Sequence, residues 1–62
     1  MSDLLSPLPV PIAEQVAEIK REIALRQRVY PRWVGLGKLT QRAADRQIAV
    51  MQAVLATLQE VR

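Results

Sequence analysis

The chain has 62 residues, neither cysteine nor histidine, and a formal net charge of +3 at pH 7. A domain of about 60 residues buries only ~60% of the surface that its unfolded chain exposes, and small chains without disulfides or metal ligands commonly gain stability by self-association. Without His or Cys the sequence offers no activated nucleophile and no transition-metal ligand set, so we expect a protein that is not an enzyme and needs no cofactor or metal.

Residues 1–11 begin the chain with prolines at alternate positions, Pro7, Pro9 and Pro11. Proline fixes φ and removes the amide donor, so this segment is expected to form an extended arm and not a paired strand. The arm could pack on the protein's own helices, on a dimer mate or in a partner's groove. It lacks the features of a signal peptide, and no run reaches the ~18 apolar residues of a membrane span, so a cytoplasmic location is expected.

A first helix is predicted over about residues 12–30, because Ile12, Val16, Ile19 and Ile23 step by four, three and four positions. The same stripe continues to Arg26 and Tyr30 at the helix end. A buried guanidinium needs a carboxylate partner, and Glu22, four residues earlier, is the local candidate. Alternatively, Arg26 extends from the end of the stripe into solvent.

The connector is predicted over residues 31–39. Pro31 disfavours helical geometry at Tyr30, while Gly35 and Gly37 are expected to supply the positive φ that ends a helical turn. Trp33 in this segment either covers the open end of a helical hairpin or anchors a partner, since Trp is common among the residues that dominate binding energy.

A second helix is predicted over about residues 41–61, with Thr40 as its N-cap. Ala44, Ile48, Met51, Leu55 and Leu58 form its packing seam. A second apolar stripe consists of Ala43, Val50, Val54 and Val61. One partner helix cannot cover so broad a face, so residues 12–62 are expected to form an all-α two-helix hairpin that pairs as a homodimeric four-helix bundle. The expected core and dimer residues are Ile19, Ile23, Ile48, Met51, Leu55 and Leu58.

The middle third of the chain carries the positive charge, with six basic residues against Asp45 alone in residues 26–46. One hypothesis is a protein-binding surface. Its residues are Arg26, Arg28, Tyr30, Arg32 and Trp33. The alternative is a nucleic-acid-binding protein in which Arg42 and Arg46 contact phosphates, although two helices are one fewer than a helix-turn-helix domain normally needs. Both compete with the possibility that these charges only keep helix faces solvated.

Several short motifs within roughly residues 18–58 resemble small helical proteins encoded by phages and prophages. They are Glu22-Ile23, Arg26, Arg28-Val29-Tyr30-Pro31, Trp33-Val34, Gly37-Lys38-Leu39, Ala44-Asp45, Gln47-Ile48, Met51 and Ala53. That group includes a quorum-sensing anti-activator, a helical dimer that binds a LuxR-type transcription regulator and a pilus assembly ATPase. The resemblance implies a phage accessory protein that inhibits host bacterial proteins by direct contact, with Tyr30, Arg32 and Trp33 as the main contacts. The proline-rich arm lies outside the resemblance.

Overall fold

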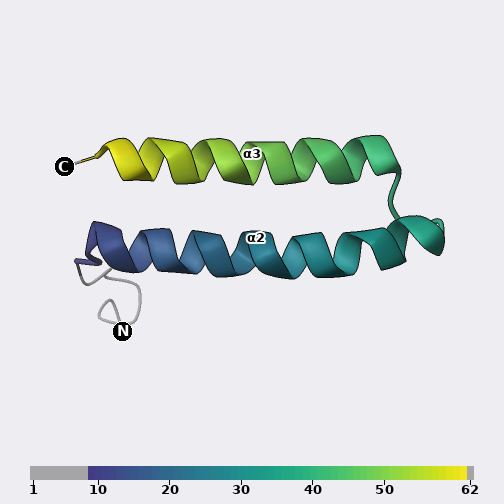
Figure 1. Ribbon diagram of the computed structural model, residues 1–62, viewed down its shortest axis with the longest axis horizontal. Helices are drawn as coiled ribbons and strands as arrows, with labels where there is room; N and C mark the ends of the chain where they lie inside the picture. Colours follow the sequence, from purple (N-terminus) through teal and green to yellow (C-terminus); the bar gives the residue numbers. More distant parts are fainter. Residues whose placement is uncertain (1–8, 62) are drawn as a thin grey trace, which may run out of the picture.

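In the computed structural model, which describes residues 9–61, the chain forms two antiparallel helices that lie side by side (Figure 1). Helix α2 spans Ile12–Gly35 and helix α3 spans Gln41–Glu60, with no strand in the described part. The predicted all-α hairpin is confirmed. Neither helix is long and apolar enough to cross a membrane. The expected extended arm, residues 1–11, falls mostly outside the described residues.

Helix α2 begins at Ile12, directly after Pro11, as the sequence predicted. The carbonyl of Pro11 accepts hydrogen bonds from the amides of Glu14 and Gln15 at 3.0 and 3.1 Å. The side chain of Gln15 reaches back and donates from Nε2 to the carbonyl of Val10 at 2.9 Å. This bond ties the residue before the helix to the first turn and fixes where the chain enters α2.

The prediction that the first helix ends near Tyr30 is wrong, because α2 continues through Pro31 to Gly35. The connector is therefore residues 36–40 and not 31–39. Pro31 lacks the amide hydrogen of a helical residue and disfavours helical geometry at the residue before it. Tyr30, however, is buried and its hydroxyl is hydrogen-bonded to α3. Packing of this side chain holds the backbone helical past the proline.

A glycine at positive φ ends α2. Gly37 has φ 75°, its amide donates to the Val34 carbonyl at 3.0 Å, and the amide of Lys38 donates to the Trp33 carbonyl at 2.9 Å. This pair of bonds is the Schellman motif, which satisfies carbonyls left without partners at a helix end. The expected positive φ is confirmed at Gly37 and wrong at Gly35, which is the last residue of α2.

Helix α3 starts with the predicted cap. Thr40 has an extended backbone, and its Oγ1 accepts a hydrogen bond from the amide of Ala43 at 3.0 Å. This bond satisfies one of the amide groups that have no carbonyl partner at a helix start. The cap and the Schellman motif together define a short turn that directs α3 back along α2.

The core of the described hairpin is small. The buried hydrophobic residues are Ile23, Tyr30 and Ala44, with 8%, 6% and 2% of their surface exposed. The other predicted core positions are half-buried: Ile19 on α2, and Ile48, Met51, Leu55 and Leu58 on α3. The molecule measures only 15 Å along its shortest axis, little more than the diameter of one helix. A single layer of two helices leaves both of its broad faces in water.

The second predicted stripe is exposed on the described hairpin. Val50, Val54 and Val61 of this stripe are 45%, 39% and 47% exposed. The stripe that α2 leaves uncovered is therefore open in the single chain.

Candidate partner-binding surface

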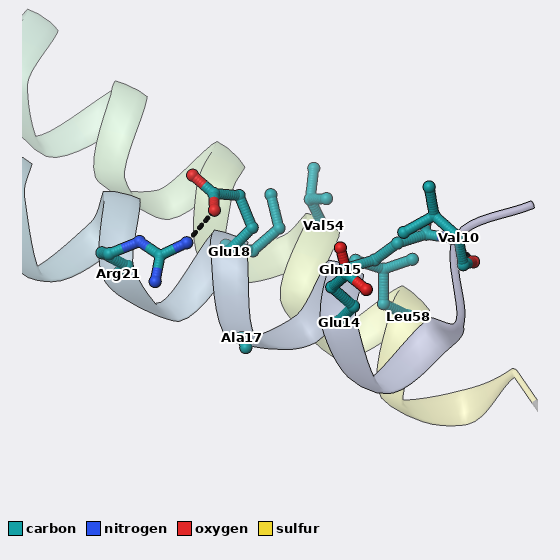
Figure 2. A pocket seen from close by; sticks show the side chains of 9 residues that line it. Val10, Glu14, Gln15, Ala17, Glu18, Arg21, Val54 and Leu58 are labelled. Carbon is teal, nitrogen blue, oxygen red and sulfur yellow. Dashed lines mark hydrogen bonds and ion pairs between the residues drawn. The ribbon is translucent and has the colours of Figure 1, made fainter. Parts of the chain in front are cut away.

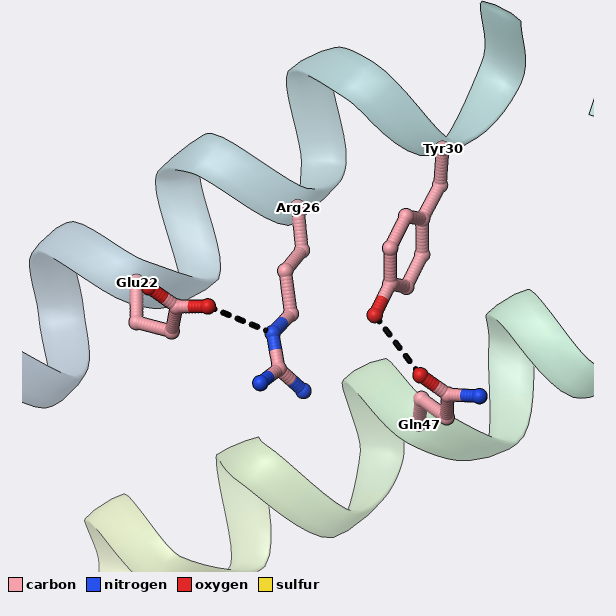
Figure 3. Close-up of polar contacts among 4 residues, drawn as sticks. All are labelled: Glu22, Arg26, Tyr30 and Gln47. Carbon is pink, nitrogen blue, oxygen red and sulfur yellow. Dashed lines mark hydrogen bonds and ion pairs between the residues drawn. The ribbon is translucent and has the colours of Figure 1, made fainter. Parts of the chain in front are cut away.

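The chain's two aromatic residues lie next to each other near the end of α2. Their ring centroids are 5.7 Å apart and the ring planes are inclined by 34°. Tyr30 is 6% exposed, and its hydroxyl donates to Oε1 of Gln47 on α3 at 2.7 Å (Figure 3). Trp33 is 44% exposed. The buried phenol thus supports an indole that stands largely in solvent.

Arg26 lies on the same helix, one turn before Tyr30, with its side chain 29% exposed. Its Nε donates to Oε1 of Glu22 at 2.9 Å (Figure 3), so the predicted partner is confirmed. This hydrogen bond, helped by the neighbouring Tyr30, raises the pKa of Arg26 above its ordinary value against the opposing effect of burial. The guanidinium stays charged at the edge of the seam.

The five predicted contact residues do not form one cluster. Residues two apart on a helix point about 200° apart, so Arg28 lies on a different side of α2 from Arg26. Arg28 and Arg32 are four residues apart, share that outer side and are exposed. Tyr30 is buried and has little surface to offer a partner. The exposed residues near the turn therefore lie on two sides of α2: Arg28 and Arg32 on one, and Trp33, seven residues after Arg26, on the side of Arg26.

The described basic residues near the turn differ in whether they are paired. Within residues 9–61 the ion pairs are Arg26 with Glu22 and Arg21 with Glu18. Four exposed arginines have no ion pair within that range: Arg28 and Arg32 of α2, and Arg42 and Arg46 of α3. Their charges are open to solvent or to an acidic partner.

A groove of about 590 Å³ lies toward the end of the hairpin far from the turn (Figure 2). Gln15, Glu18 and Ile19 contribute to it from α2, and Val54 and Leu58 from α3. The sequence pattern did not predict this groove. The second apolar stripe predicted an uncovered face on α3. It did not indicate that α2 forms one side of a groove along this face.

A second hollow of about 390 Å³ continues along α3. It shares Val54 and Leu58 with the first groove and extends it to Val50 and Thr57. The two hollows together form a continuous, mainly apolar strip along the hairpin, named here the open flank. Its main residues are Gln15 and Ile19 from α2 and Val50, Val54, Thr57 and Leu58 from α3, and the charged residues that also line the hollows are Glu14, Glu18, Arg21 and Arg46.

The described residues contain no group of three or more acidic, cysteine or histidine side chains that could hold a metal ion. The polar side chains of the candidate partner-binding surface carry guanidinium, carboxylate and amide groups, which can form hydrogen bonds and ion pairs with a partner. No protein-family model, curated protein or solved structure matches the chain. The resemblance to phage-encoded helical proteins therefore stays a prediction, and a function has to be argued from the surface itself.

Proposed function

We propose that this chain is a small homodimeric accessory protein of phage type that binds a host bacterial protein in the cytoplasm and inhibits it by direct contact. The proposed contact surface consists of Trp33 with Arg28 and Arg32, near the turn of each hairpin. A LuxR-type transcription regulator, whose inhibition would block quorum sensing, and a pilus assembly ATPase are the candidate partners that the sequence resemblance implies.

The exposure of Trp33 is the observation that carries this proposal. An indole costs free energy to keep in water, and here 44% of Trp33 is exposed although a buried tyrosine lies 5.7 Å away. Trp and Arg are the residue types most enriched where binding energy concentrates. The rigid support from Tyr30 lowers the entropy lost when a partner covers the indole.

Homodimerisation is supported by the small core and the open flank. Three buried hydrophobic side chains among residues 9–61 are few for a hairpin of this length, given that folding must offset roughly 1–2 kcal/mol of backbone entropy per residue. A second copy would cover Val50 and Val54.

Truncation of the indole tests the contact surface. Trp33→Ala is expected to weaken binding to a purified LuxR-type regulator or pilus assembly ATPase by about 30-fold or more, measured by calorimetry. Leu25→Ala is the matched control, because Leu25 also lies on α2 and is 41% exposed, and it should leave the affinity within about threefold. Far-ultraviolet circular dichroism of both variants checks that the helices persist.

Two results would contradict the proposal. One is that the wild-type chain binds neither of these partners. The other is that Trp33→Ala binds as tightly as the wild type while remaining helical. A variant that loses its helices together with its binding would assign Trp33 to the fold instead of the contact surface.

The four unpaired arginines near the turn favour one alternative, a nucleic-acid-binding protein. Arg28 and Arg32 would contact phosphates from one edge of the hairpin, and Arg42 and Arg46 from the other. Neutralising phosphates releases counterions, so binding must weaken steeply as salt rises. A gel-shift titration at several salt concentrations tests this alternative, and an absence of binding at low salt would dismiss it.

A further inference from the structure

We propose that the two copies join by crossing their α2 helices at the helix midpoint, where Arg26 of each copy pairs with Glu22 of the partner subunit. The inference rests on the homodimer proposed above and specifies its geometry. Glu22 and Arg26 lie on either side of residue 24, next to the midpoint of the Ile12–Gly35 helix. The observations behind it are the incomplete pairing of one guanidinium, the composition of the open flank and the register of the two helices.

The Arg26 guanidinium carries more N–H donors than its own chain pairs. Its Nε donates to Oε1 of Glu22, and the Tyr30 side chain is a second, weaker partner that also raises the pKa of Arg26, whereas a guanidinium carries five N–H donors. Figure 3 shows the two terminal nitrogens directed away from Glu22, with no interaction drawn to either. If a second copy covers this face, the Arg26 guanidinium becomes buried. Its remaining N–H donors then need a carboxylate partner, because an unpaired buried charge is costly.

Arg26 and Glu22 lie on the same side of the hairpin as the open flank. Gln15, which belongs to the open flank, is seven residues before Glu22, and residues seven apart lie on nearly the same side of a helix. Arg26 is one turn further along that line. The central charged pair of α2 is thus next to the exposed valines of α3, and a second copy seated on these valines must also meet the pair.

The helix register places the charged pair level with the middle of the valine row. Tyr30 lies opposite Gln47, to which it is hydrogen-bonded, and the helices are antiparallel, so the midpoint of α2 lies level with about residue 53 of α3. Val54 is next to that level, and it lines both hollows of the open flank. A two-fold axis through this level would bring Val54 of the two copies close together.

Two stacked arrangements of the hairpins have two-fold symmetry. In both, the axis lies in the plane between the two stacked hairpins. If it runs parallel to the helices, α2 lies on α3 of the partner subunit, and Arg26 faces the row of Val50 and Val54. If it runs across the helices within that plane, α2 crosses α2 of the partner subunit in antiparallel orientation. With the axis at residue 24, residue 26 then meets residue 22 of the partner, so each guanidinium gains a second carboxylate. Charge complementarity selects the second arrangement.

Charge reversal tests this geometry. Arg26→Glu places four carboxylates at the crossing, and Glu22→Arg places four guanidinium groups there, so each variant alone is expected to raise the dimer dissociation constant by about a hundredfold or more. An equimolar mixture of the two variants faces only opposite charges and is expected to regain a dimer of wild-type affinity. Analytical ultracentrifugation measures all three samples, and mass spectrometry of the intact complex identifies the mixed pair.

Lys20→Glu is the matched control. Lys20 also lies on α2, is exposed and lines neither hollow of the open flank, so reversing its charge should leave the dissociation constant within about threefold. Circular dichroism verifies that each variant remains helical. Trp33 is seven residues after Arg26 and therefore lies on the same side of α2 as the crossing, nine residues from the axis, about 14 Å along the helix.

The outcomes separate this inference from the function proposed above. If the wild type is a dimer and both charge-reversal variants dimerise as tightly, the crossing at residue 24 is wrong and the homodimer stands. If both variants are monomeric and mixing does not restore a dimer, the cross-pairing is also wrong. If the wild-type chain is monomeric, the homodimer and its geometry fall together, and binding through Trp33 remains testable on the monomer.

Discussion

Tyr30 connects the two helices in two ways. Its ring is buried at the seam, and its hydroxyl bonds Gln47 across the seam at 2.7 Å. Because it stands directly before Pro31, the same side chain also holds the helical backbone where proline would otherwise favour a break. A single residue therefore determines how far α2 extends and where Trp33 is displayed.

Removal of that hydroxyl has a defined expected cost. Tyr30→Phe should lower the free energy of unfolding by about 1 kcal/mol, the usual net contribution of a hydrogen bond between neutral groups. Gln47→Ala serves as the second arm of a double-mutant cycle measured by urea denaturation. If the two substitutions prove additive, the hydroxyl and the amide make no coupled contribution, contrary to the prediction.

At the scale of whole elements, the turn between the helices depends on two glycines with different roles. Gly37 adopts φ 75°, whereas Gly35 is helical, and a Cβ built at either position meets nothing within 4 Å. Space is therefore no obstacle to a side chain at either site, and the backbone conformation alone distinguishes them.

The two glycines predict opposite effects of one substitution. Gly37→Ala should destabilise the hairpin by about 1 kcal/mol, because a side chain disfavours left-handed geometry. Gly35→Ala should stabilise it by roughly 0.5 kcal/mol, since alanine has the higher helix propensity. Thermal and urea denaturation of the two variants measure both signs, and the same sign for both would contradict the Schellman assignment.

Local patterns predicted most of the fold. The stripes of Ile12 to Ile23 and Ala44 to Leu58 predicted two helices, and Thr40 and Glu22 were identified from short-range spacing alone. The end of α2 was not predictable in this way, because burial of Tyr30 against a segment 17 residues away overrides the local preference at Pro31. The separation of Arg26 from Arg28 was predictable, because both lie within the predicted helix and residues two apart on a helix point to different sides.

At the scale of the whole molecule, the thin hairpin and its uncovered valines make stability depend on concentration. Unfolding of a dimer releases two chains, so dilution lowers the thermal midpoint by mass action. With an unfolding enthalpy near 0.7 kcal/mol per residue over two chains, a tenfold dilution should lower the midpoint by about 6 °C.

A monomeric variant provides the comparison for that measurement. Val54→Asp introduces a charge on the open flank, where Val54 is 39% exposed in the single chain, and should abolish the concentration dependence as well as lower the midpoint. Scanning calorimetry over a hundredfold concentration range follows both proteins. A wild-type midpoint that does not move with concentration would contradict the dimer.

In most proteins, buried residues tolerate fewer substitutions than exposed ones. A hairpin only one helix thick is expected to reverse this relation when burial is measured on the single chain. With three buried hydrophobic side chains in the described hairpin, few of its positions are constrained by an interior. The strongest selection would then act on residues such as Val50 and Val54, which a survey of the isolated hairpin would rank among the most permissive. A complete substitution scan should find intolerance where solvent exposure suggests freedom.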